Sequence, residues 1–374
     1  MLASWLVCGL SIIPTLISLI LSRFLLGVLN GLHMSLASGY IKETFPSHIR
    51  KPLGAVYSTS RIFGMLFCYL VSEISGYAHT LDNTEHILVF LGPAIIGTIQ
   101  SILFFIFMPD SIVESISKLG EERALECLSY FYEGENIELR YRQMQKEMAG
   151  AMRRTMTYRK ISINNRKNLS SLHMAMLRQF CGETYIVIYA RQMMQFLDSP
   201  YADMSPAIIN GIQLAAGIIG IYTVQRFARF HLLMTGCCLL LVLNICIAVT
   251  DYYELPVECL ISMTLFMLPN GICLSSVAWC YPSELVAPSQ GKYSSFLNWV
   301  CSTMVAMIPP YIVAATPRES AYPIFFFFTG YLLVAIVINL RILPRTNRHG
   351  RTAYASETDR SVDGSMERGL VPNR

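Results

Sequence analysis

Long apolar runs recur along the 374-residue chain and are separated by polar gaps. Each run has close to the ~20 residues that a helix needs to cross the hydrocarbon core of a bilayer. Backbone polar groups cannot stay unpaired in lipid, so the runs are predicted to be α-helices. We predict ten of them, at 2–17, 19–41, 54–77, 87–108, 172–197, 204–225, 231–250, 256–280, 293–315 and 321–342. The predicted fold class is therefore all-α, a polytopic transmembrane helical protein.

Composition and charge agree with this class. The chain is 53% hydrophobic and 14% charged, whereas roughly a quarter of the residues of a soluble domain are charged. The gaps GYAHTLDNTEH, LDSPYADMSP and TDYYELP contain no Lys or Arg, and the gaps that alternate with them are basic. By the positive-inside rule the basic gaps are cytoplasmic, and ten crossings place both termini in the cytoplasm. We expect a plasma-membrane protein in a lipid bilayer.

One long polar segment divides the apolar runs into two groups. We predict four parts: an incomplete amino-terminal membrane bundle of four helices at 1–108, cytoplasmic linker helices at 109–171, a carboxyl-terminal six-helix membrane bundle at 172–342, and a disordered cytoplasmic tail at 343–374. In the linker, Ser111 and Glu114 fit a capping box. The following EERALECLSYFY places Ala124, Leu125, Leu128, Phe131 and Tyr132 on one face of a helix.

Several classes of chemistry are not indicated by the sequence. The 11 cysteines lie mostly inside apolar runs, without the spacing of a zinc site or a disulfide framework. No nucleophile–base pair, metal-ligand spacing or phosphate-binding loop is recognisable. The net charge of +4 is explained by membrane orientation, so nucleic acid is not an expected partner. We therefore expect no enzyme, no cofactor and no metal, and the sequence does not indicate an oligomeric state.

Polar and aromatic side chains inside the apolar runs are candidates for binding a small molecule. A sugar at membrane depth needs amides that both donate and accept, together with aromatic faces. The candidate substrate-binding residues are Gln179, Gln213, Trp279, Asn298 and Trp299. Each residue alone has a plainer interpretation, because a single Trp often anchors a helix at the interface and a single Asn often bonds a neighbouring helix.

Four motifs resemble those of one transporter family. SRFLLGVLNGLHMSLASGYIKETFPSHIRKPLG is similar to the fourth helix and following loop of sugar porters in the major facilitator superfamily. WCYPSELVAPSQGK resembles the family's Trp-x-x-Pro-Ser-Glu signature, LNW its eleventh-helix Asn-Trp, and RQFCGETYIVIY its seventh-helix Gln-Gln-x-x-Gly-x-Asn motif. The resemblance covers nearly all of residues 1–345. It implies a major facilitator-like fold that transports a sugar or polyol by alternating access, with or without proton coupling.

The resemblance also implies a role for charged residues at the cytoplasmic helix ends. They are expected to form ion pairs across the two halves that hold the outward-facing state and break during transport. These gating residues are Arg23, Glu43, Arg50, Arg226, Arg229 and Glu284. The alternative is that their charges serve only to orient the chain in the membrane.

Departures from the family pattern support a second function. Counted against the family, the first two helices are missing. Arg178 and Thr184 stand in place of the first glutamine and the asparagine of the seventh-helix motif, and Ser58 in place of a fifth-helix glutamine. The alternative is a truncated or non-transporting relative that acts as a sensor or partner-binding protein. Glu183 can titrate as a proton carrier, but we expect it to pair with Arg178 or Arg191.

Overall fold

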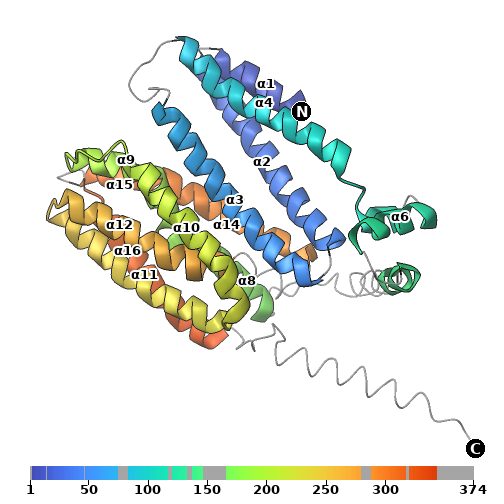
Figure 1. Ribbon diagram of the computed structural model, residues 1–374. Helices are drawn as coiled ribbons and strands as arrows, with labels where there is room; N and C mark the ends of the chain where they lie inside the picture. Colours follow the sequence, from blue (N-terminus) through green and yellow to red (C-terminus); the bar gives the residue numbers. More distant parts are fainter. Residues whose placement is uncertain are drawn as a thin grey trace, which may run out of the picture. The chain divides into compact units, whose positions relative to one another are not determined.

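Helices form the regular secondary structure of the described chain (Figure 1). The computed structural model describes residues 2–13, 15–45, 47–74, 83–116, 120–132, 137–145, 166–278, 288–316 and 320–342. No strand occurs within these ranges, which confirms the predicted all-α class.

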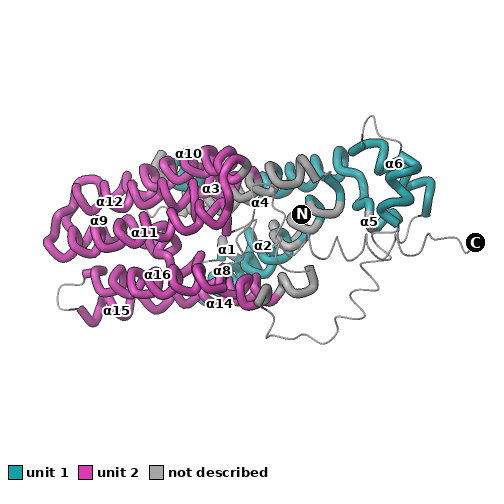
Figure 2. The backbone as a smooth tube through the Cα atoms, turned by 90° about the horizontal axis from the view of Figure 1, so that it is seen from below, with its two compact units in different colours: residues 1–54, 68–161 teal, residues 55–67, 162–374 magenta. Residues whose placement is uncertain are grey.

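The helices divide into two compact units (Figure 2). Unit 1 comprises residues 1–54 and 68–161, and unit 2 comprises residues 55–67 and 162–374. Helix α3 (Ser47–Ile74) contributes to both, because its middle segment groups with the helices of unit 2. The predicted assignment of parts to membrane bundles, a cytoplasmic linker and a tail concerns their place in a membrane and stays a prediction.

Unit 1 contains apolar helices and a small polar subassembly. Its other helices are α1 (Leu2–Ile12), α2 (Leu16–Thr44), α4 (Asn83–Phe107), α5 (Ile112–Glu114), α6 (Glu121–Phe131) and a helical segment at 137–145. Helix α1 packs against α2 and α4, and the indole of Trp5 donates a 2.8 Å hydrogen bond to Thr98 Oγ1 on α4. Thr15 is the N-cap of helix α2, and its hydroxyl accepts a hydrogen bond from the Ser18 amide at 3.3 Å.

The linker helices enclose a core of their own. Ala124, Cys127 and Leu128 of α6 are buried, and Tyr141 and Met144 of the segment 137–145 belong to the same cluster. The apolar face predicted for α6 is thus confirmed. The Ser111 half of the predicted capping box is wrong, because this N-cap residue of α5 makes no side-chain capping bond. Helix α5 has three residues and ends at Glu114, the residue predicted to complete the box.

Unit 2 is a larger helical bundle. Besides residues 55–67 of α3, it contains α8 (Arg166–Phe180), α9 (Glu183–Phe196), α10 (Ser205–Arg226), α11 (Arg229–Tyr252), α12 (Pro256–Pro269), the π-helix η2 (Asn270–Ser275), α14 (Pro288–Met307), α15 (Pro309–Ala315) and α16 (Tyr322–Ile342). Helix α11 packs against α12 and α16, α8 against α14, and α10 against η2. Phe266, Phe325, Phe328 and Leu233 are fully buried in its core. Burial of such side chains is the main stabilising contribution inside the bundle.

Three apolar runs predicted as single helices are interrupted. The run 172–197 is wrong as one helix, because it breaks into α8 and α9 at Gly182, which has φ +108°. A Cβ atom at Gly182 would lie 3.1 Å from Asn244 Oδ1 and 3.2 Å from the Phe328 ring. The Asn244 amide donates to the Cys181 carbonyl at 2.9 Å, so a polar group freed by the break is satisfied within the protein.

The other two interruptions involve proline. The run 256–280 passes from α12 into the π-helix η2 directly after Pro269. The run 293–315 changes from α14 to α15 at Ile308, which precedes Pro309. Proline removes an amide donor and crowds the preceding turn, so it is a common place for a helix to kink or break.

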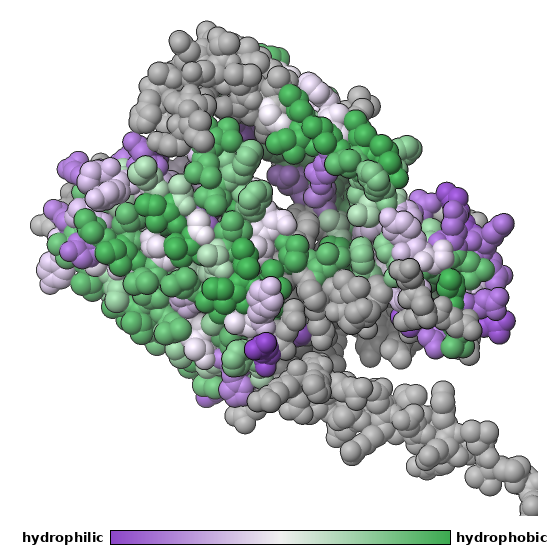
Figure 3. Space-filling view, viewed as in Figure 1, coloured by the Kyte–Doolittle hydropathy of each residue, from purple (hydrophilic) through white to green (hydrophobic). Residues whose placement is uncertain are grey.

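The helices have the length and surface of membrane spans. Six described segments are long and apolar enough to cross a membrane: Leu16–His33, Ser205–Val224, Arg229–Tyr252, Pro256–Ala278, Tyr293–Ala315 and Tyr322–Ile342. Large apolar side chains such as Ile17, Phe105 and Leu333 are exposed on the helix surfaces. Figure 3 shows apolar side chains over α10, α11 and α12, and hydrophilic ones around α6. The chain is an integral membrane protein, and the number of ten crossings stays a prediction.

Candidate functional site

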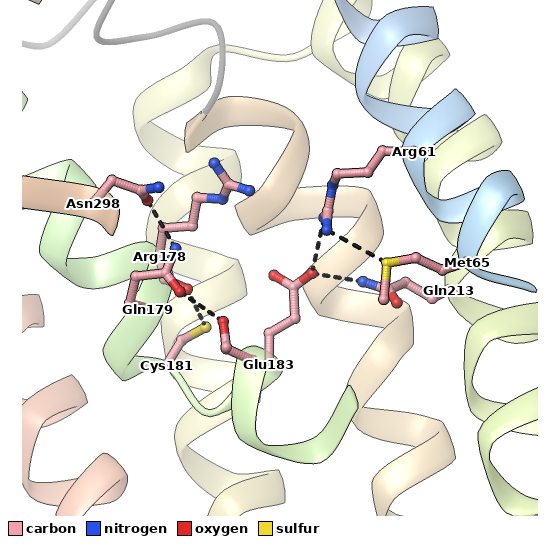
Figure 4. Close-up of polar contacts among 9 residues, drawn as sticks. Arg61, Met65, Arg178, Gln179, Cys181, Glu183, Gln213 and Asn298 are labelled. Atoms are coloured by element: carbon pink, nitrogen blue, oxygen red, sulfur yellow. Dashed lines mark hydrogen bonds and ion pairs between the residues drawn. The ribbon is translucent and has the colours of Figure 1, made fainter. Parts of the chain in front are cut away.

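A cluster of polar side chains lies in unit 2 around the break between α8 and α9 (Figure 4). Its first part is a relay of three side chains. Thr184 Oγ1 of α9 donates to Gln179 Oε1 of α8 at 2.7 Å, and Gln179 Nε2 donates to Asn298 Oδ1 of α14 at 2.8 Å. Gln179 is 4% and Asn298 9% exposed. The relay fixes the orientation of the Gln179 amide and connects three helices.

The second part of the cluster is centred on the carboxylate of Glu183. Gln213 of α10 donates from Nε2 to Glu183 Oε1 at 2.6 Å. The same oxygen lies 3.7 Å from Nη2 of Arg61, on the part of α3 that belongs to unit 2. Glu183 is the first residue of α9, where the amide dipoles of the helix favour a negative charge. A buried carboxylate is thus held by an amide, a guanidinium and a helix terminus.

Some hydrogen-bonding capacity in this cluster is unused. Within the described residues, Gln213 Oε1 and Arg61 Nε are buried and have no hydrogen-bond partner. Gln213 is only 1% exposed. Buried polar atoms in proteins are nearly always hydrogen-bonded, so each exception needs an explanation. The cluster therefore holds an acceptor and a donor that a ligand with hydroxyl or acidic groups can satisfy.

Three of the five predicted substrate-binding residues meet in this cluster. Gln179 and Asn298 bond each other directly, and Gln213 joins them through Glu183, the neighbour of Thr184. Trp299 is 46% exposed, so the structure does not bring it into the buried cluster. Trp279 lies outside the described residues.

Arg191 and Glu183 both contact charged partners that the sequence did not predict. Arg191 pairs with Asp203, with Nη2 and Nε at 2.7 and 2.9 Å from Oδ1, which corrects the expectation that it pairs with Glu183. Glu183 Oε1 lies 3.7 Å from Nη2 of Arg61, a residue that the sequence analysis did not name. The signal that could have identified Arg61 is its charge in the middle of the apolar run 54–77.

The predicted gating residues are only partly described. Arg23 and Arg226 are exposed and Arg229 is buried. The side chains of Glu43 and Arg50, and the whole of Glu284, lie outside the described residues. The proposed ion pairs among these residues therefore stay a prediction.

Further features of the described residues bear on the choice of site. The described part of the chain contains no group of three His, Cys, Asp or Glu side chains able to hold a metal ion.

A cavity of about 220 Å³ lies farther along α9, lined by Tyr185, Asp251 and Tyr322 among others. Its buried carboxylate, that of Asp251, already accepts a 2.5 Å hydrogen bond from Ser320. The cluster around Gln179 and Glu183 has unsatisfied polar atoms and is the stronger candidate site.

The fold and the sequence both match known transporters. The fold is similar to that of the proton:xylose symporter XylE bound to 6-bromo-6-deoxy-D-glucose, with a TM-score of 0.77, 19% identity, and coverage of 91% of this chain and 74% of that one. A partially occluded, inward-open structure of XylE from E. coli gives a TM-score of 0.74 at 18% identity, over 88% and 71% of the two chains. These likenesses show a major facilitator fold.

Relatives are found along almost the whole chain. Facilitated glucose transporter member 2 of solute carrier family 2 from Mus musculus is 25% identical over 361 residues, which cover 91% of this chain and 66% of that protein. The glucose transporter GlcP of Staphylococcus epidermidis is 23% identical, over 88% and 74% of the two chains. The chain thus spans about two thirds of the length of the mouse relative. The sequence profile of the sugar (and other) transporter family matches residues 1–355, and the chain therefore belongs to this family, a family of transporters and not of enzymes.

Proposed function

We propose that the chain transports a sugar or polyol across the plasma membrane by alternating access, either as a facilitator or with proton coupling. The observation that carries the proposal is the buried polar cluster on α8, α9, α10 and α14. Amide, hydroxyl and carboxylate groups that converge from several helices match a ligand whose hydroxyls donate and accept in several directions. The names of the relatives, which are glucose and xylose transporters, support the same substrate class.

The broken helices next to the cluster support a transport mechanism. Discontinuous membrane helices commonly frame the substrate sites of transporters, near the middle of the bilayer. Here the break at Gly182 lies between Gln179 and Glu183, the two residues on which the cluster is centred. A rearrangement at this break would move both side chains together. In the proposal, substrate binding is therefore coupled to the change that opens the site to one side of the membrane or the other.

We further propose that the charges at the helix ends set the orientation and the resting state. Both termini would lie in the cytoplasm, with Arg23, Arg226 and Arg229 at the helix ends on that side of the membrane. Ion pairs of these arginines with Glu43 and Glu284, together with Arg50, would hold the outward-facing state until substrate is bound.

Uptake into liposomes tests the proposed function. Purified chain is reconstituted, and uptake of labelled D-glucose, L-glucose, xylose, trehalose and sorbitol is measured against protein-free vesicles. The proposal predicts uptake that saturates and that distinguishes at least one sugar from its enantiomer or from the polyol. Equal, non-saturating entry of all five compounds would contradict it.

One observation favours the alternative of a non-transporting relative. Both ends of the Gln179 amide are already bonded inside the protein, to Thr184 and Asn298. A ligand that must displace these hydrogen bonds gains less binding free energy than a ligand that binds amides with no partner. In this alternative, a sensor or partner-binding protein would bind sugar without moving it, so the discriminating result is saturable binding to the purified chain with no flux in liposomes.

A further inference from the structure

Two charges, the buried Glu183 and the half-buried Arg61, distinguish this cluster from a purely neutral sugar site. Arg61 and Glu183 both lie within predicted membrane runs, at 54–77 and 172–197. Charged groups at membrane depth are costly, face the interior of a bundle and commonly mark the path or site of a substrate. Neutral sugars need neither charge, since amides and hydroxyls serve their hydroxyl groups.

The contact between Arg61 and Glu183 is long for an ion pair. Nη2 of Arg61 lies 3.7 Å from Glu183 Oε1, whereas charge-assisted hydrogen bonds are about 2.7–2.9 Å long. The pair formed by Arg191 and Asp203 in the same unit reaches 2.7 Å. Arg61 also keeps a buried Nε without a hydrogen-bond partner within the described residues, and its Nη1 contacts only the weak acceptor Met65 Sδ at 3.6 Å. The guanidinium of Arg61 can therefore donate shorter hydrogen bonds to an anionic ligand.

A second guanidinium belongs to the same group of side chains. Arg178 precedes Gln179 on α8 and is among the residues of this cluster in Figure 4. The side chains drawn together thus include two guanidinium groups and one carboxylate. The positive potential favours a ligand with a negative charge, because electrostatic interactions are strong where water is excluded.

We propose that the substrate of this site is an acidic sugar, a polyhydroxylated compound with one carboxylate. The ligand carboxylate binds the guanidinium of Arg61 through Nε and a terminal nitrogen, in the bidentate geometry that arginine offers. A ligand hydroxyl donates to Gln213 Oε1, the other unsatisfied atom of the cluster. This inference rests on the proposed function, and it names the substrate class of the same site.

Binding to the purified full-length chain tests this inference without requiring flux. The ligands are D-glucuronate, its neutral methyl ester and D-glucose, so that charge is varied at nearly constant shape. The wild type is expected to bind glucuronate at least about tenfold more tightly than either neutral compound, the effect of one charge-assisted hydrogen bond in a buried site.

Two variants change the charge of the cluster in opposite directions. Arg61→Gln is expected to reduce glucuronate affinity to that of the methyl ester, and Glu183→Gln is expected to increase it, because a repelling carboxylate is removed while an acceptor for Gln213 remains. Misfolding lowers affinity in both variants and cannot produce these opposite shifts. Arg191→Gln, on α9 but paired with Asp203, is the matched control and is expected to keep the preference for glucuronate.

The outcomes separate this inference from the proposed function. Equal or tighter binding of glucose and the ester overturns the acidic substrate and leaves sugar transport standing. A preference for glucuronate that persists in Arg61→Gln, or a loss in Glu183→Gln as large as in Arg61→Gln, overturns the role of this pair. Binding of none of the three ligands by a folded wild type counts against both proposals.

Discussion

Asn298 and Gln179 illustrate how single side chains define the candidate site. Both amides are largely buried, and buried polar groups are nearly always hydrogen-bonded. Gln179 uses its oxygen for Thr184 and its nitrogen for Asn298. The relay does not use the nitrogen of Asn298, which in the proposed site would donate to a hydroxyl of the sugar.

Replacing Asn298 by alanine is expected to weaken sugar binding strongly. The variant removes one hydrogen-bonding partner of the ligand and the acceptor of Gln179 Nε2, a loss of roughly 1–3 kcal/mol that corresponds to about 5- to 150-fold in affinity. The measurement is the half-saturating concentration for uptake in liposomes. Thr303→Ala, on the same helix but exposed and bonded only to the backbone carbonyl of Trp299, is the control. Unchanged kinetics in Asn298→Ala would remove this residue from the site.

At this scale the sequence predicted residue types better than contacts. Gln179, Gln213 and Asn298 stand out because polar amides are unusual in apolar runs. Their contacts could not be predicted, since Gln179 and Asn298 are 119 positions apart and meet only through the packing of α8 against α14. Arg61 lies outside the motifs that resemble the family, and its charge within the apolar run 54–77 is the signal that marks it.

Among the helices, the break between α8 and α9 has the largest effect on the site. Hydropathy predicts where a membrane run begins and ends, but it does not detect a change of backbone direction inside the run. The run 172–197 was therefore predicted as one helix. Gly182 was part of the recognised motif, and its positive φ and its contacts with Asn244 and Phe328 explain why a glycine is required there.

Gly182→Ala is expected to destabilise the protein. The added methyl group would meet Asn244 Oδ1 and the Phe328 ring at 3.1 and 3.2 Å, in a backbone conformation that side chains disfavour. Strain of this kind costs about 1–3 kcal/mol, so the midpoint of thermal unfolding in detergent should fall. Gly330→Ala is the matched control, because nothing lies within 4 Å of a Cβ there and α16 is helical at this position. An equal or higher midpoint for Gly182→Ala would show that the break does not depend on glycine.

For the whole molecule, composition and run length were enough to predict an all-α membrane protein. The driving force is common to all such chains, because lipid satisfies no backbone polar group and enforces helices. The family followed from motifs and is shown by the match over residues 1–355. The hydropathy pattern could not predict how the helices group into units. Residues 55–67 of α3 group with residues 162–374, which lie far later in the chain.

Membrane topology is a prediction at this scale. A reporter inserted after Gln195 or within 79–84 should be accessible from outside the cell, and one within 135–165 only from the cytoplasm, because the basic gaps stay inside. Accessibility to a membrane-impermeant label measures this directly. Labelling of 135–165 from outside would contradict the ten-crossing map and the cytoplasmic placement of both termini.

The most direct test of the central claim is sugar counterflow in liposomes. Vesicles containing the chain are loaded with unlabelled substrate, and entry of a trace of labelled substrate is followed. A carrier that alternates access at one buried site predicts a transient accumulation of label above its outside concentration, strongly reduced in Asn298→Ala at the same trace concentration. Label that enters at the same rate with or without internal substrate, and equally in wild type and variant, would contradict the account.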